Sequence, residues 1–321
     1  HIVVRRQRQM CIRDSANSLC KNLNKDDEII LSEIEHHANI IPWQMAAKKY
    51  GLNIKYIKID DSYNLDLDHL NSLLTSKTKI VSIVGESNMS GMLPNIKEIV
   101  SNVKSKSDAI FILDGAQLVP HRFVDVQDLG IDFLCVSGHK MLGPTGIGVV
   151  WGRKELWDSM DPVYGGGDMI EEVYYDKATW APVPHKFEAG TPPFVEAIGL
   201  GVAAEYLMNI TMSEVQQHSD SLREYAKSKL ENIDGLNVIH SISKNAGCTF
   251  AMSVEGAHAA DISLMLDTYG VAVRAGHHCV QPFHRKLKLD ATFRATGYIY
   301  NNEEDFDTLA YAIENSIKML K

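Results

Sequence analysis

Two stretches, AIFILDGAQ at residues 109–117 and FLCVSGHK at residues 133–140, decide the fold. Each is a short apolar run that ends in a polar cluster, and an unbroken apolar run is typical of a strand covered on both faces of a parallel sheet. In open parallel sheets, ligands bind beyond the carboxyl ends of the strands. The two polar clusters therefore mark the candidate site.

Similar runs continue the pattern on both sides of these stretches. Strands are expected at residues 28–33, 53–59, 79–84, 109–113 and 133–136. Amphipathic segments between them predict helices at residues 42–50, 67–74 and 95–103. Alternating strands and helices indicate βαβ units, so we predict an α/β fold with a mostly parallel central sheet.

The pattern changes towards the C-terminus. Long helices are expected at residues 195–208 and 214–232, followed by strands at 249–254 and 271–274 mixed with helices at 259–269 and 305–320. We predict a large α/β domain at residues 16–209 and a smaller C-terminal α+β domain at residues 210–321. Residues 1–15 are rich in arginine and fit no element that follows, so we expect a non-native or disordered tail.

Composition narrows the classes of function. The 321 residues carry a formal net charge of -9, so no global basic field attracts nucleic acid or an anionic membrane. No stretch approaches the roughly 20 apolar residues that a membrane span needs. The five cysteines form no C-x-x-C pair, which argues against a disulfide framework or a zinc site. We expect a cytoplasmic protein in a reducing compartment.

The ends of the two deciding strands carry residues suited to cofactor chemistry. Asp114 follows the first apolar run and Lys140 follows the second. Pyridoxal 5'-phosphate (PLP) needs a lysine amine that binds it covalently and a carboxylate that keeps its pyridine nitrogen protonated. Each residue alone has an ordinary explanation, because such an aspartate often caps a turn and such a lysine usually faces solvent. The joint pattern, D-G-A-Q followed by S-G-H-K-x-x-G-P-x-G, favours a PLP site.

A longer series of motifs points to a family. They are EHHAN at 35–39, SNMSG at 87–91, DGAQ at 114–117, SGHK at 137–140 with GPTG at 143–146, FEAGTP at 187–192, RAGHHC at 274–279 and RA at 294–295. In order and spacing they resemble the Suf-type (group II) cysteine desulfurases, in the class V aminotransferase branch of the fold-type I PLP enzymes. The resemblance implies PLP-dependent conversion of L-cysteine to L-alanine, with a persulfide formed on the enzyme for iron–sulfur cluster assembly.

The resemblance assigns residues to the cofactor ring. Lys140 would bind PLP covalently, and Asp114 would pair with the ring nitrogen. Gln117 would hydrogen-bond the ring hydroxyl oxygen, and His36 would stack on the ring. Without the resemblance, a single histidine such as His36 is more often a core or capping residue.

Three further residues are assigned to the cofactor phosphate. Ser137 and His139 would hold it directly. Thr191 would reach the phosphate of a partner subunit, which implies a homodimer with shared active sites. In the family, an N-terminal segment that is missing here adds a threonine-containing turn at this phosphate. We therefore expect the 321-residue chain to bind PLP more weakly than a form with that segment, and to be a poorer enzyme.

The same resemblance assigns the substrate site. Asn88 and Arg294 would hold the carboxylate of cysteine, the arginine through its two-pronged guanidinium. Arg274 opens the loop that carries Cys279 and would also face the substrate, although a structural ion pair is an equal alternative. Cys279 would be the sulfur acceptor, since a thiol in such a loop can be exposed and partly ionised. With Lys140 and His36, it completes the predicted catalytic set.

The run His277-His278-Cys279 also contains the residue types that ligate metals. No other cysteine or histidine cluster completes a tetrahedral set, so no metal site is predicted. The basic stretch at residues 284–288 is interpreted as a solvated loop face that at most helps to dock an acidic partner.

The length of the segment between Cys279 and Arg294 indicates whether a partner protein is needed to accept the sulfur. Only residues 280–293 separate Cys279 from Arg294. This resembles the group with a short, constrained active-site loop, in which the persulfide does not swing outward unaided. A sulfur-acceptor protein of the Suf type is therefore expected.

Other functions remain open at this stage. Selenocysteine lyase and cysteine sulfinate desulfinase activities use the same scaffold, with L-selenocysteine as an alternative substrate. A catalytically impaired fragment or a non-catalytic scaffold is the alternative from another class. A class V aminotransferase is disfavoured because its chemistry has no use for Cys279.

Overall fold

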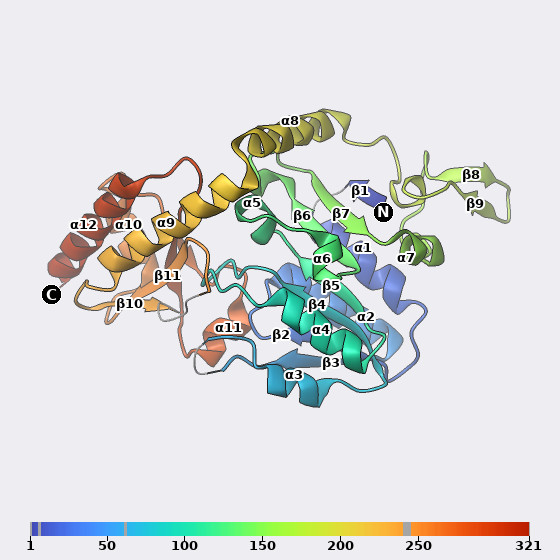
Figure 1. Cartoon of the computed structure of the whole chain (residues 1–321), viewed down its shortest axis with the longest axis horizontal. Coiled ribbons are helices and arrows are strands. Elements are labelled where there is room, and N and C mark those ends of the chain that lie inside the picture. The colour runs from blue at the N-terminus through green and yellow to red at the C-terminus, as the bar shows by residue number, and fades with distance from the viewer. Residues whose placement is uncertain (1, 6–7, 61–62, 240–244, 321) are drawn as a thin grey trace.

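The computed structural model of the chain describes residues 2–5, 8–60, 63–239 and 245–320. Its larger part is built on a seven-stranded sheet with the order β1-β7-β6-β5-β4-β2-β3 (Figure 1). The strands are β1 (Ile2–Arg5), β2 (Glu28–Ser32), β3 (Asn53–Ile57), β4 (Thr78–Val84), β5 (Ile110–Asp114), β6 (Phe133–Ser137) and β7 (Gly148–Gly152). β6, β5, β4, β2 and β3 pair in parallel, and β7 and β1 run antiparallel at one edge. The predicted α/β fold with a mostly parallel sheet is confirmed.

Both faces of this sheet are covered, which explains its unbroken apolar strands. In β5, Phe111 and Leu113 belong to one buried cluster, whereas Ile112 belongs to the cluster on the other face. Four of the five residues of β5 are therefore buried, and the alternation expected of a half-exposed strand is lost.

Helices on opposite faces supply the cover, as Figure 1 shows. α1 (Arg8–Cys20) and α2 (Ile41–Tyr50) contribute Ile12 and Trp43 to one cluster. α3 (Leu67–Leu73) and α4 (Ile96–Lys106) contribute to the other cluster. Shorter helices are α5 (Leu118–His121), α6 (Val126–Leu129) and α7 (Lys154–Ser159), with 3-10 turns η1 (His37–Asn39), η2 (Gly138–Lys140) and η3 (His185–Phe187).

Helix ends follow local chemistry. Asn95 caps α4, because its side chain accepts the backbone N–H of Glu98. α2 ends at Gly51, whose φ of 71° lies in the left-handed region that favours glycine. Both ends fall within a residue of the predicted boundaries.

The expectation of an N-terminal tail at residues 1–15 is wrong for the part that the structure describes. β1 pairs with β7, and in α1 both Ile12 and Ser15 are buried. The reason is a helical stripe, Ile12, Ala16, Leu19 and Cys20, that crosses the supposed boundary and packs against the sheet. The arginines around it obscure this stripe. Residues 1, 6 and 7 lie outside the described residues.

Two long helices connect the larger part of the molecule to the smaller one (Figure 1). α8 (Phe194–Ile210) and α9 (Met212–Leu230) meet at Thr211 with a bend of 76°. Among the described residues, no single helix is long and apolar enough to cross a membrane. Of the described helices, only the bent pair α8 and α9 has the necessary length and apolar composition, and only when the two are counted together.

The smaller part contains an antiparallel sheet with the order β10-β11-β13-β12. Its elements are β10 (Leu236–Ile239), β11 (Thr249–Val254), α10 (Ala259–Asp267), β12 (Arg274–Gly276), α11 (Gln281–Lys286), β13 (Thr292–Thr296) and α12 (Glu303–Leu320). The strand expected at residues 271–274 begins only at Arg274. Val271, the first residue of the predicted strand, lies outside β12, because its N–H donates to the carbonyl of Leu266 at the end of α10.

A hairpin of β8 (Ile170–Val173) and β9 (Ala178–Trp180) was not predicted. It projects from the body in Figure 1 and carries exposed aromatic side chains, among them Tyr174 and Tyr175.

A buried carboxyl group lies where the two parts meet. Glu86, just beyond β4, is 1% exposed, and a Cβ added to Gly247 of the smaller part would lie only 2.1 Å from its Oε1. Burial raises the pKa of Glu86 to about 8, although the charges of Arg122, Lys140 and Arg223 oppose the shift. The group is therefore largely neutral at physiological pH.

This raised pKa predicts a loss of stability at alkaline pH. The folded state holds the Glu86 proton more tightly than the unfolded state, so its contribution is complete below the ordinary pKa and is lost as pH rises through about 8. Buried histidines such as His278 have lowered pKa values and titrate below this window. Urea unfolding should show a free energy of unfolding that falls between pH 6.5 and 8, and Glu86→Gln should fall less steeply. Equal slopes for both proteins would contradict the assignment.

Candidate active site

The polar clusters predicted from the sequence meet at one edge of the central sheet. β2, β4, β5 and β6 are parallel, so their carboxyl ends point the same way. His36 lies after β2, Asn88 after β4, Gln117 after β5 and Lys140 after β6. This is the edge at which open parallel sheets bind ligands.

A cavity of about 480 Å³ opens there. It is lined by His36, Asn88, Gln117, Ser137, His139, Lys140, Thr145, Gly146, Ile147, Arg274, Cys279 and Arg294. The structure thus brings nine of the eleven predicted site residues to one cavity. Asp114 is fully buried at the end of β5 and does not line it, and Thr191 is exposed outside it. The individual roles of these residues stay predictions.

A buried acidic residue ends β5 at this edge of the sheet. Asp114 has no exposed surface, and its Oδ1 accepts the backbone N–H of Ala116 at 3.2 Å. A buried carboxyl group next to a lysine-lined cavity suits a ligand with a basic ring nitrogen, because burial strengthens the pairing of charges.

The turn after β6 forms a small polar cradle. Ser137 Oγ lies 3.1 Å from His139 Nδ1, so a hydroxyl and an imidazole stand side by side. Two glycines make this turn tight: a Cβ on Gly138 would lie 2.9 Å from the carbonyl oxygen of Ile147, and one on Gly143 would lie 2.8 Å from the carbonyl oxygen of Gly138. Hydrogen-bond donors in such a turn suit an anion such as phosphate.

His36 is held in one orientation. It caps η1, since its Nδ1 accepts the backbone N–H of Ala38 at 2.9 Å. The capping role that is usual for a lone histidine is therefore present, and the residue lines the cavity as well.

A buried network lies next to His36 in the sequence and fixes the backbone there. Glu35 accepts bonds from Ser32, from Asn39 Nδ2 at 2.7 Å and from the backbone N–H of Val84 at 3.0 Å. Burial nevertheless raises the pKa of Glu35 to about 8. Sequence reasoning included Glu35 in a motif but gave it no role.

Two arginines from the smaller part face each other across a strand pair. Arg274 in β12 and Arg294 in β13 are cross-strand partners. Arg294 Nη1 donates to the carbonyl oxygen of Asn88 at 2.6 Å. Burial lowers the pKa of Arg294 to about 10, with the charge of Arg274 adding to the effect, so Arg294 remains a cation at neutral pH. The pair suits a carboxylate.

The loop that carries Cys279 is held from several sides. Arg274 Nη2 donates to Cys279 Sγ at 3.9 Å, and the backbone N–H of His37 donates to the Cys279 carbonyl at 2.7 Å. The ring of His37 accepts the N–H of Gln281 at 3.0 Å. The nucleophile candidate is thus half-buried and fixed to the larger part of the protein.

Among the described residues, no group of three or more histidine, cysteine or acidic side chains is arranged to hold a metal ion. In the run His277-His278-Cys279, the ring of His278 turns away into the core, where Nε2 lies 2.8 Å from Thr292 Oγ1.

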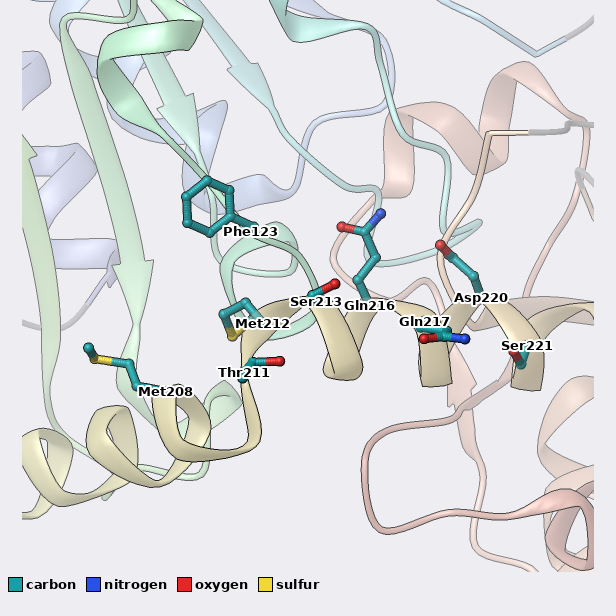
Figure 2. Close-up of a pocket in the computed structure, with 9 residues that line it drawn as sticks. All are labelled: Phe123, Met208, Thr211, Met212, Ser213, Gln216, Gln217, Asp220 and Ser221. Atoms are coloured by element: carbon teal, nitrogen blue, oxygen red, sulfur yellow. The ribbon is translucent and has the colours of Figure 1, made fainter.

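A second hollow lies elsewhere. It measures about 820 Å³ and forms where α8 turns into α9, with Phe123 above the elbow (Figure 2). Its lining is Phe123, Met208, Thr211, Met212, Ser213, Gln216, Gln217, Asp220 and Ser221, and it includes none of the predicted site residues.

Comparison with known proteins identifies the family of the chain. The sequence profile of the family "Aminotransferase class-V" matches residues 11–309. A cysteine desulfurase from Haloferax volcanii is 42% identical over 292 residues, which cover 91% of this chain and 68% of the relative. A probable cysteine desulfurase from Staphylococcus epidermidis is 43% identical over 295 residues, covering 92% of this chain and 71% of the relative.

Solved structures agree. A crystal structure of a cysteine desulfurase from Escherichia coli superposes with a TM-score of 0.94 at 34% identity, covering 99% of this chain and 79% of that one. An apo cysteine desulfurase from Thermococcus onnurineus gives a TM-score of 0.93 at 32% identity, with the same coverage. The chain belongs to the class V aminotransferase family of PLP enzymes. Its relatives within that family are cysteine desulfurases.

The residues present fit the cofactor that this family uses. The buried carboxyl of Asp114, the amine of Lys140 and the amide of Gln117 are the groups that a PLP ring requires. The glycine-lined turn with Ser137 and His139 offers a place for its phosphate. The cavity edge after β6 would accordingly hold PLP, with Lys140 as its covalent attachment.

Some residues of the site were missed. Thr145, Gly146 and Ile147 line the cavity, although only the motif around them was noted. Thr145 and Gly146 belong to the GPTG motif at residues 143–146, and the tight turn after η2 brings them and Ile147 to the cavity. Glu86, which is outside this lining but feels the charge of Lys140, carried no sequence signal at all.

The attachment of PLP can be checked directly. Borohydride reduction of the holoprotein followed by peptide mapping should place the pyridoxyl label on Lys140, and Lys140→Ala should take up no label. Lys154→Ala, at an exposed lysine of α7, serves as the matched control and should label normally. A label on any other lysine in the unmodified protein would refute the cofactor geometry.

Proposed function

We propose that this chain is a PLP-dependent cysteine desulfurase that converts L-cysteine to L-alanine and takes up the sulfur on Cys279. The observation that carries the proposal is the shared cavity: Lys140 from the larger part, and Cys279 and Arg294 from the smaller part, line the same 480 Å³ space. Relatives named cysteine desulfurase at about 42% identity support it.

Each side chain has a task in this reaction. Arg294 and Asn88 hold the substrate carboxylate, and Arg274 adds a second cation. Bound PLP supplies an electrophilic carbon for the substrate amine and a ring that stores electrons. Lys140 moves the proton at the substrate Cα. The thiolate of Cys279 attacks the substrate sulfur, an S–S bond forms as the C–S bond breaks, and alanine is left.

We extend the proposal to a sulfur-acceptor protein of the Suf type, with iron–sulfur cluster assembly as the destination of the sulfur. The hydrogen bonds from His37 and Arg274 hold the Cys279 segment against the cavity. A persulfide there does not travel on its own loop, so the acceptor has to reach it.

A homodimer is also part of the proposal. α8 exposes an apolar stripe of Phe194, Ile198, Val202 and Tyr206, and Thr191 is exposed just before it. Such a stripe is typical of a surface that another chain covers. Thr191 would then serve the cofactor phosphate of the partner, and sedimentation of the holoprotein measures the state.

A cytoplasmic location completes the proposal. Cys20, Cys135, Cys248 and Cys279 are free thiols, and the first three are buried. Free thiols fit a reducing compartment.

The persulfide role gives the main test of the function. Cys279→Ala should keep PLP bound while its alanine release from cysteine falls by about 100-fold or more, because the nucleophile is lost and the cofactor site is intact. Cys20→Ala, which removes a buried thiol that does not line the cavity, is the matched control. Turnover of cysteine by Cys279→Ala at close to the normal rate would overturn the proposal. Faster turnover of selenocysteine than of cysteine by the unmodified protein would instead support the lyase alternative.

Dependence on an acceptor can be measured with the same assay. Without acceptor, alanine release should show a burst of roughly one equivalent per active site and then stall, as the persulfide accumulates. Dithiothreitol should restore slow turnover, and a Suf-type acceptor protein should restore it faster. Steady turnover with neither present would show that the loop delivers its sulfur without help.

A further inference from the structure

We infer that His278 is a positioning residue for the nucleophile Cys279, held by a hydrogen-bonded chain that runs through Thr292 to His284. The inference rests on the proposed function, since it concerns how the thiol is aimed at the substrate sulfur. Thr292 has no predicted role, and the expectation that residue 284 lies on a solvated loop face is wrong, because His284 is part of α11 and is fully buried.

The backbone at the nucleophile needs such a support. His278 has a φ of 52° and Cys279 a φ of 60°, so two consecutive residues with side chains occupy the left-handed region. This conformation is unfavourable for L residues and persists only where the surroundings enforce it. The direction of Cys279 Sγ depends on that backbone.

His278 is fixed at both of its ends. Its carbonyl oxygen accepts Asn88 Nδ2 at 2.7 Å, and its ring Nε2 lies 2.8 Å from Thr292 Oγ1. The side chain is only 1% exposed. The residue directly before the nucleophile is therefore anchored to the larger part through its backbone and to β13 through its ring.

The chain continues to a second histidine. Thr292 Oγ1 lies 3.0 Å from His284 Nε2, and His284 Nδ1 lies 3.1 Å from the carbonyl oxygen of Val280. The anchor thus returns to the residue that follows Cys279. The hydrogen-bonded chain therefore holds both residues that flank Cys279, His278 before it and Val280 after it.

The donors and acceptors of this chain are determined. The Val280 carbonyl only accepts, so His284 Nδ1 carries a proton. Burial lowers the pKa of His284, so the ring is neutral and its Nε2 accepts from the Thr292 hydroxyl. Thr292 has then used its proton and accepts from His278 Nε2–H. Each bond fixes the next, which gives the chain one direction.

His278 acts by position and not by transferring a proton. Burial, with the charge of Arg294 next in size, lowers the pKa of His278 to about 3. The ring is therefore neutral at neutral pH. Its neighbour His277 is exposed, so the two histidines before Cys279 differ in environment.

The test uses two matched pairs in the holoenzyme. Thr292→Val removes the hydroxyl but keeps a β-branched side chain of similar size, and Thr292→Ser restores the hydroxyl. His278→Gln removes the ring, and His277→Gln makes the same change one residue away on the surface.

We expect Thr292→Val and His278→Gln to lower kcat for alanine release by about 10- to 100-fold, the scale of a small misplacement of a reacting group. KM for cysteine and the spectrum of bound PLP should stay near normal. Thr292→Ser and His277→Gln should behave as the unmodified protein.

The outcomes separate this inference from the proposed function. Failure of the unmodified protein to release alanine would overturn the function. Normal kcat in Thr292→Val or His278→Gln, with an active unmodified protein, would overturn the inference alone. An equal kcat loss in Thr292→Ser and Thr292→Val would do the same, since the hydroxyl would then be irrelevant. Should Thr292→Val fail to fold, the comparison of His278→Gln with His277→Gln decides.

Discussion

Burial of both faces of the central sheet is the constraint on which the rest of this structure depends. Most side chains within β4, β5 and β6 are buried, so the groups of the larger part that line the cavity lie at the strand ends or in the turns that follow them. Parallel pairing then brings those ends to one edge. Asp114 and Lys140 lie at the same edge because they follow neighbouring parallel strands.

Asn88 joins the two parts of the molecule at that edge. Its side chain donates to His278 beside the nucleophile, and its carbonyl oxygen accepts from Arg294. The larger part supplies the predicted cofactor residues, and the smaller part supplies Arg274, Arg294 and the thiol of Cys279. Together with the hydrogen bonds of His37, Asn88 therefore links the two halves of the proposed chemistry, and the buried Glu86 lies two residues before it.

The sequence predicted the features that depend on local pattern. The parallel strands, the helices between them and the polar strand ends follow from unbroken apolar runs and helical periodicity, and nine of the eleven site residues meet in one cavity. The rest depends on contacts between distant residues. The Thr292 hydroxyl has a role only because β13 lies beside the Cys279 loop, and α1 was missed because arginines surround its apolar stripe. The hairpin β8–β9 has exposed strands and no core pattern to reveal it.

The facing pair Arg274 and Arg294 has a consequence for selectivity. Two like charges in adjacent strands repel each other until an anion comes between them, so a bound carboxylate gains the relief of that repulsion as well as its own attraction. An amine thiol without a carboxylate, such as cysteamine, obtains neither. If Arg274 and Arg294 hold the substrate carboxylate as proposed, the site discriminates by the charge at the far end of the substrate, and small inorganic anions compete for the same place.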